Sequence, residues 1–235
     1  MRFNLTPVVK NLLIACVVFF IATVLLENKN INLLELLGMY YPFHPKFMPY
    51  QLVTHMFMHG SFSHILFNMF ALVMFGMVLE NIMGSKKFLQ LYFFSGLGAI
   101  LIHLLAQSII IHQHTGHWFL NDEALKQFLA TNPDATTFER VKENYSSLMV
   151  GASGCLYGVT VAFALLFPNT PLYIMFIPVP IKAKFVIPGF ILLDLVLGVS
   201  NFAWDPVAHF AHIGGGLFGF LITYYWRKFD KTRFW

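Results

Sequence analysis

Four polar side chains stand in otherwise apolar stretches of the sequence: Ser153, His64, Asn68 and His212. Ser153 lies in a Gly-Ala-Ser-Gly motif at the start of an apolar run, where a serine is either a helix cap or a nucleophile. Histidine is the side chain most often used as a general base, and His64 and Asn68 supply hydrogen-bond donors. A nucleophile, a base and preorganised donors are the groups that acyl transfer to water requires.

The elements that must position these groups lie in a membrane. The chain has 235 residues, of which 57% are hydrophobic and 11% charged, and its mean hydropathy is +0.67. These values indicate a polytopic membrane protein, and the length suits a single membrane domain, 1–235. Cys16 and Cys155 both lie in apolar runs, so we interpret them as packing residues. The net charge of +4 comes from basic residues near helix ends, so no nucleic-acid partner is expected.

Six apolar stretches qualify, or nearly so, as membrane-spanning helices, because about 20 such residues cross a bilayer. The predicted spans are 11–26, 61–79, 88–111, 153–168, 184–200 and 206–226. The first is kept as a helix because no small-x-small cleavage site follows it. The long loop 112–147 carries short amphipathic patterns at 122–129 and 137–145. The sequence therefore predicts an all-α membrane protein with a six-transmembrane-helix bundle.

The distribution of basic residues predicts the orientation of the bundle. With the N-terminus in the cytoplasm, ten Lys and Arg residues lie inside and five outside, as expected for a multi-pass protein with both termini cytoplasmic. The second, fourth and sixth helices then run from outside to inside. Ser153, His64, Asn68 and His212 therefore fall at the same depth, towards the outer leaflet.

Small residues predict that two of these helices pack closely. Glycines four residues apart occur in the fourth and sixth helices, as Gly154 with Gly158 and Gly215 with Gly219. Such pairs let helix backbones approach each other in membranes. Close approach brings the Ser153 hydroxyl within reach of His212, which would act as general base.

No carboxylate partner for His212 is evident in the nearby sequence. Asp205 is interpreted as a solvated turn or cap, so the prediction is a Ser–His dyad and not a triad. Asp194 is an ionisable group within the membrane and by default a functional candidate; we expect it to pair with a polar group inside the bundle and assign it no catalytic role. His209 is a second candidate base, but the glycines after His212 favour the latter.

Three motifs, in order, resemble those of the rhomboid family of intramembrane serine proteases. They are His64-Ile65-Leu66-Phe67-Asn68, Gly151-Ala152-Ser153-Gly154 with Tyr157, and Ala211-His212-Ile213-Gly214-Gly215. The resemblance covers roughly 45–226 and implies a six-helix core with Ser153 as nucleophile and His212 as base. It also implies that His64 and Asn68 complete an oxyanion hole with the Ser153 backbone N–H, and that the Tyr157 ring packs against His212.

The resemblance extends to the surroundings of the site, where the chain also departs from the family pattern. Phe67 matches the family residue that faces the gap between the second and fifth helices, and His55 and His59 resemble loop-anchoring and water-holding residues. Many members carry Trp-Arg where this chain has Tyr50-Gln51, which puts the usual anchoring of the first loop in doubt.

Other classes fit less well. His55 and His59 are four residues apart and three further histidines cluster at 112–117, but no His-Glu-x-x-His motif is present, so no metal or cofactor is expected. The halves of the chain show no repeat of the kind found in transporters. A catalytically weak relative that binds and escorts transmembrane helices stays as the alternative to a protease. The compact core favours a bacterial inner membrane, and transmembrane proteins are the expected substrates.

Overall fold

The computed structural model describes residues 4–131, 134–173, 179–200 and 209–229. Within them the chain is all-α apart from a short antiparallel hairpin. Besides a 3₁₀ turn at His55–Phe57 and a π-helical turn at Leu72–Gly76, the elements are α1 (Pro7–Glu27), α2 (Leu33–Leu37), α3 (Gln51–Thr54), α4 (Phe62–Ala71), α5 (Met77–Thr115), α6 (Asp122–Thr131), α7 (Ala135–Ser146), α8 (Ser153–Leu166), β1 (Pro171–Leu172), β2 (Ile181–Lys182), α9 (Ala183–Ser200) and α10 (His209–Phe229).

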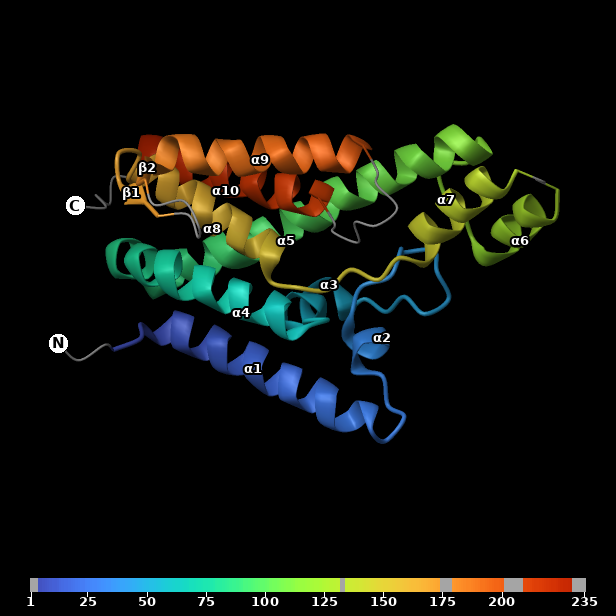
Figure 1. Cartoon of the computed structure of the whole chain (residues 1–235), viewed down its shortest axis with the longest axis horizontal. Helices are drawn as coiled ribbons and strands as arrows, with labels where there is room; N and C mark the ends of the chain where they lie inside the picture. Colours follow the sequence, from blue (N-terminus) through green and yellow to red (C-terminus); the bar gives the residue numbers. More distant parts are fainter. Residues whose placement is uncertain (1–3, 132–133, 174–178, 201–208, 230–235) are drawn as a thin grey trace.

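Within the described residues, the predicted apolar stretches are helical apart from one or two residues at the start of the second and the end of the fourth. The second and third form one helical run, Phe62–Thr115, in which Gly84 alone has non-helical dihedral angles, φ 78° and ψ 158°. Glycine adopts positive φ without steric cost, and Figure 1 shows that the chain reverses direction between α4 and the greater part of α5. Among the described residues, only α1, the run Phe62–Thr115 and α9 are both long and apolar enough to span a membrane. The count of six spanning helices therefore stays a prediction.

The helices form a bundle with two distinct ends (Figure 1). The start of α1, the end of α10 and the β1–β2 hairpin lie at one end, and α2, α3, α6 and α7 lie at the other. α10 packs mainly against α5 and α8 at the centre. Large apolar side chains such as Val18, Leu192 and Val199 are exposed on the outer helices, which suits a surface in contact with lipid.

The predicted close approach of glycine-bearing helices is confirmed. A Cβ atom added to Gly215 would lie 1.9 Å from the carbonyl oxygen of Gly154, and one added to Gly219 would lie 2.3 Å from the Cα of Gly158. The α8 and α10 backbones are therefore in direct contact along two turns, which no larger residue at these positions would permit.

The loop 112–147 folds into the two helices that its amphipathic patterns predict, α6 and α7. They enclose a second apolar cluster, separate from the bundle core and formed by Tyr41, Ile111, Leu120, Leu125, Val141 and Tyr145. Polar contacts join this unit to its neighbours: the Gln107 side chain donates to the Asn144 carbonyl at 2.6 Å, and the Tyr145 hydroxyl donates to the Phe43 carbonyl at 3.1 Å. The helices α6 and α7 are therefore docked on the first loop and the end of α5.

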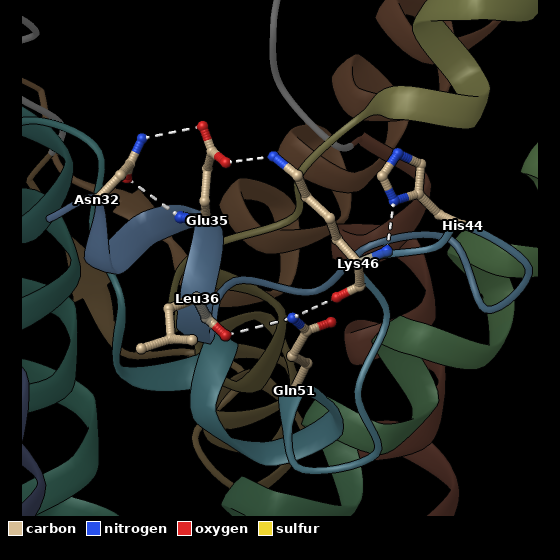
Figure 2. A network of polar contacts seen from close by, with 6 residues as sticks. All are labelled: Asn32, Glu35, Leu36, His44, Lys46 and Gln51. Atoms are coloured by element: carbon tan, nitrogen blue, oxygen red, sulfur yellow. Dashed lines mark hydrogen bonds and ion pairs between the residues drawn. The ribbon is translucent and has the colours of Figure 1, made fainter.

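The buried side-chain amide of Gln51 anchors the first loop (Figure 2). Gln51 is 1% exposed, and its Nε2 donates to the carbonyls of Leu36 at 3.2 Å and Lys46 at 3.1 Å. Its Oε1 accepts from the Met48 backbone N–H at 3.1 Å. Although this chain has Tyr50-Gln51 where many rhomboid-like sequences have Trp-Arg, the first loop is anchored, and the anchoring residue is Gln51. The exposed Glu35–Lys46 ion pair in Figure 2 adds little, since solvent screens it.

The anchored loop supports the segment that leads into α8. Met39 and Met149 exchange two backbone hydrogen bonds of 2.9 Å, and the Gly151 N–H donates to the His55 carbonyl at 2.9 Å. The residues just before Ser153 are thus held by backbone contacts to the first loop.

Candidate active site

Ser153 is the first residue of α8 and contacts a histidine of α10. Its Oγ lies 3.0 Å from Nε2 of His212, which is hydrogen-bond distance. The close packing of α8 on α10 sets this distance, because the Gly154–Gly215 contact lies beside both residues. The structure therefore brings the predicted nucleophile and the predicted base together.

The His212 ring is held on a second side by Tyr157. The two rings stack with centroids 4.3 Å apart and planes inclined by 9°. Tyr157 lies one turn after Ser153 on α8, so the same helix supplies the serine and the surface against which the imidazole packs. This contact restricts rotation of the His212 ring.

A carboxylate also contacts His212, so the expectation that none lies near it is wrong. Asp194 Oδ1 lies 3.1 Å from His212 Nδ1 and 2.6 Å from His209 Nδ1. Asp194 comes from α9, 18 residues before His212 in sequence, and α9 runs opposite to α10 (Figure 1). Asp205, the carboxylate close to His212 in the sequence, lies outside the described residues.

Counted over the whole residue, Asp194 is 6% exposed and His209 is 7% exposed. The expectation that Asp194 pairs with polar groups inside the bundle is thus confirmed. Of the two candidate bases, it is His212 that contacts Ser153, while His209 contacts the carboxylate. The sequence signal that could have linked Asp194 to the site is its charge within a membrane helix.

A cavity of about 740 Å³ opens beside Ser153 and His212, and residues of α4 line its other wall. Among them are His64, Phe67 and Asn68. The Asn68 side chain is buried, and its Nδ2 has no hydrogen-bond partner among the described residues. An unpaired buried donor costs about 1–3 kcal/mol, so this amide is available to a group that enters the cavity.

The backbone at Gly151 fits around His64. Gly151 has φ +125°, and a Cβ atom there would lie 2.7 Å from the His64 ring. Only glycine satisfies both conditions without strain. His64 also meets the His59 ring edge to face, with centroids 5.0 Å apart, and His59 Nε2 is buried with no hydrogen-bond partner among the described residues. His55 Nδ1 lies 2.7 Å from the Gln51 carbonyl oxygen.

A metal ion is another possible ligand for this group. Among the described residues, the side chains that could hold one are Asp194, His209 and His212. Their ligand atoms lie within 4.8 Å of one another. Hydrogen bonds within the group already use the nitrogen atoms that face the carboxylate, and His212 uses its other nitrogen on Ser153. We therefore interpret the group as a chain of hydrogen bonds ending on the serine.

Comparison with known proteins agrees with this architecture. A family model described as the rhomboid domain matches residues 46–229. An uncharacterized mitochondrial rhomboid protein of Schizosaccharomyces pombe is 27% identical over 206 residues, covering 75% of this chain and 51% of its own length. Mitochondrial rhomboid protein 1 of Saccharomyces cerevisiae is also 27% identical, over 180 residues that cover 75% of this chain and 42% of that protein.

Rhomboid-like protein 15 of Arabidopsis thaliana is 42% identical over a shorter stretch of 64 residues, which covers 27% of this chain and 16% of the relative. The chain spans about half the length of the two yeast relatives, or less. The family match covers the helices that carry Ser153, His212, His64 and Asn68. This chain is an integral, multi-pass membrane protein that belongs to the rhomboid family.

Proposed function

We propose that this protein is a serine endopeptidase that hydrolyses peptide bonds in or near transmembrane segments of other membrane proteins. Membership of the rhomboid family supports a function of the intramembrane protease kind. The observation that carries the proposal is the 3.0 Å contact between Ser153 Oγ and His212 Nε2 beside the cavity. Nucleophile and base within hydrogen-bond distance are the signature of covalent catalysis by serine.

In the proposed reaction, His212 accepts the proton of Ser153 as its oxygen attacks the scissile carbonyl carbon. The negative charge of the tetrahedral intermediate is met by donors from Asn68, His64 and the Ser153 backbone N–H. His212 then gives the proton to the leaving amine, and an acyl group stays on Ser153. Water, activated by His212, hydrolyses this ester and restores the serine.

The position of the cavity is compatible with a transmembrane helix as substrate. It is bounded by α4 and by the segment that precedes α8, and Phe67, which lines it, is 53% exposed. A transmembrane helix that approaches across α4 could contact Phe67, which is both exposed and part of the cavity lining. The resemblance to the rhomboid family suggests substrates with small residues at the scissile bond and a helix that unwinds easily.

The test is cleavage of a single-span model substrate by the purified protein in detergent. Wild type is expected to release two fragments, and Ser153→Ala at matched folding is expected to release none. Equal cleavage by both proteins would mean a different nucleophile or a contaminant. If neither cleaves while both bind the substrate helix, the helix-escort function replaces the protease.

Removal of either side-chain donor is expected to slow cleavage without abolishing it. A single oxyanion donor is typically worth about 10²- to 10³-fold in kcat, so His64→Ala and Asn68→Ala should each lower kcat by about 100-fold. Phe62→Ala is the matched control, because Phe62 lies on the same helix and is 70% exposed. If both donor variants kept the wild-type kcat, the oxyanion assignment would be wrong.

The proposed location is a bacterial inner membrane, with both termini cytoplasmic and the active site towards the outer leaflet. The distribution of Lys and Arg supports this orientation; two of the relatives are mitochondrial by name. Lys126→Cys on α6 is expected to react with a membrane-impermeant maleimide in intact cells, and Lys86→Cys, beside Gly84, only after permeabilisation. The native Cys16 and Cys155 are buried and should stay unmodified. The reverse pattern of labelling would invert the topology.

A further inference from the structure

A buried carboxylate receives two histidines next to the candidate nucleophile. Oδ1 of Asp194 lies 2.6 Å from Nδ1 of His209 and 3.1 Å from Nδ1 of His212. The side chains of Asp194, His209 and His212 are 8%, 7% and 12% exposed. A carboxylate in such a site is costly to ionise unless it accepts hydrogen bonds, and donation by the two ring N–H groups stabilises the ionised form of Asp194.

These contacts decide which nitrogen of His212 carries the proton. An ionised carboxylate only accepts hydrogen bonds, so the ring nitrogens that face it must both be protonated. A neutral His212 with its proton on Nδ1 has a lone pair on Nε2. That lone pair faces Ser153 Oγ at 3.0 Å. This is the tautomer that accepts a proton from serine, whereas a proton on Nε2 would block the transfer.

We propose that Asp194 is a positioning residue for His212, which fixes the imidazole in the tautomer and orientation that a general base needs. The site then works as a Ser–His–Asp chain in which His209 holds the carboxylate through a second hydrogen bond. The inference rests on the proposed protease function. Asp194 keeps its negative charge throughout; when His212 takes the Ser153 proton, the carboxylate stabilises the resulting imidazolium.

The geometry separates this role from simple packing. Tyr157 stacking fixes the plane of the His212 ring, but a ring held in its plane can still carry its proton on either nitrogen. Asp194 makes the contact to Nδ1 that removes this ambiguity. An asparagine at 194 has nearly the same shape, and its amide can donate to Nδ1, which favours the wrong tautomer.

The kinetic test compares wild type, Asp194→Asn and Leu193→Ala on the single-span substrate. Asp194→Asn is expected to lower kcat by about 100-fold or more and to change KM by less than about twofold, because Asp194 does not line the cavity. Leu193→Ala is the matched control, since Leu193 is the neighbouring residue on α9 and is 52% exposed. Unchanged kcat in Asp194→Asn would overturn the inference.

A spectroscopic test determines the tautomer of His212 in the wild-type protein. The ¹⁵N chemical shifts of histidine rings distinguish the two neutral tautomers, and the His212 signals are assigned by their loss in His212→Gln. Wild type is expected to show His212 protonated on Nδ1; protonation on Nε2 would overturn the inference. If wild type cleaves no substrate, it is the proposed protease function that is wrong. The role of Asp194 in fixing the tautomer of His212 is then decided by the ¹⁵N chemical shifts alone.

Discussion

The substitution His212→Ala is expected to lower kcat by about 10³-fold or more, close to the effect of Ser153→Ala. The serine hydroxyl is a weak nucleophile at neutral pH unless a base removes its proton, and His212 is the base within reach, at 3.0 Å. The variant should still fold, because Asp194 keeps its contact with His209 when the His212 ring is removed.

The double variant Ser153→Ala/His212→Ala provides the sharper test of this pair. Residues that act as one unit have non-additive effects, so loss of both should cost little more than loss of either. Thermal unfolding of the three variants and wild type supplies the folding control. A His212→Ala protein that kept more than about a tenth of the wild-type kcat would exclude His212 as the base.

The substitution Gly215→Ala is expected to lower kcat by about 100-fold and to destabilise the bundle by about 1–3 kcal/mol. Its Cβ would lie 1.9 Å from the Gly154 carbonyl oxygen, and that oxygen belongs to a helix backbone, which cannot rotate away as a side chain does. The helices α8 and α10 must therefore separate. A displacement of about 1 Å between reacting groups can cost about 100-fold in rate, and overpacking costs about 1–3 kcal/mol.

Gly216→Ala is the matched control for this prediction. The same Cβ added one residue later would lie 3.4 Å from Val161 Cγ2 and 3.5 Å from Ile191 Cδ1, which are ordinary contacts. We expect this variant to cleave at close to the wild-type rate and to unfold at a similar temperature. Equal effects of Gly215→Ala and Gly216→Ala on kcat would mean that the Gly154–Gly215 contact does not set the Ser153–His212 distance.

The sequence predicts the helices and the meeting of Ser153 with His212 for identifiable reasons. Long apolar runs report membrane helices directly, since a bilayer demands about 20 such residues. The direction of alternate helices places the polar groups at one depth, and glycines at 154 and 215 mark where two backbones touch. These signals are local, so they can be read without the tertiary structure.

The neighbours of Asp194 and the anchoring of the first loop are not local in this sense. The helix α9 is apolar on its exposed side and on its buried side. Its sequence therefore lacks the alternation of polar and apolar residues that would show which side faces α10, and Asp194 could not be placed there. Gln51 likewise gains its contacts from residues up to 15 positions away. Only the packed structure shows that Gln51 anchors the first loop.

The most direct test of the account is to identify the residue that a fluorophosphonate modifies. Such a probe reacts with an activated serine, and peptide mass spectrometry locates the adduct. We predict one adduct on Ser153 in wild type and none in Ser153→Ala or His212→Ala. An adduct on another residue, or equal labelling of wild type and His212→Ala, would contradict a nucleophile at Ser153 activated by His212.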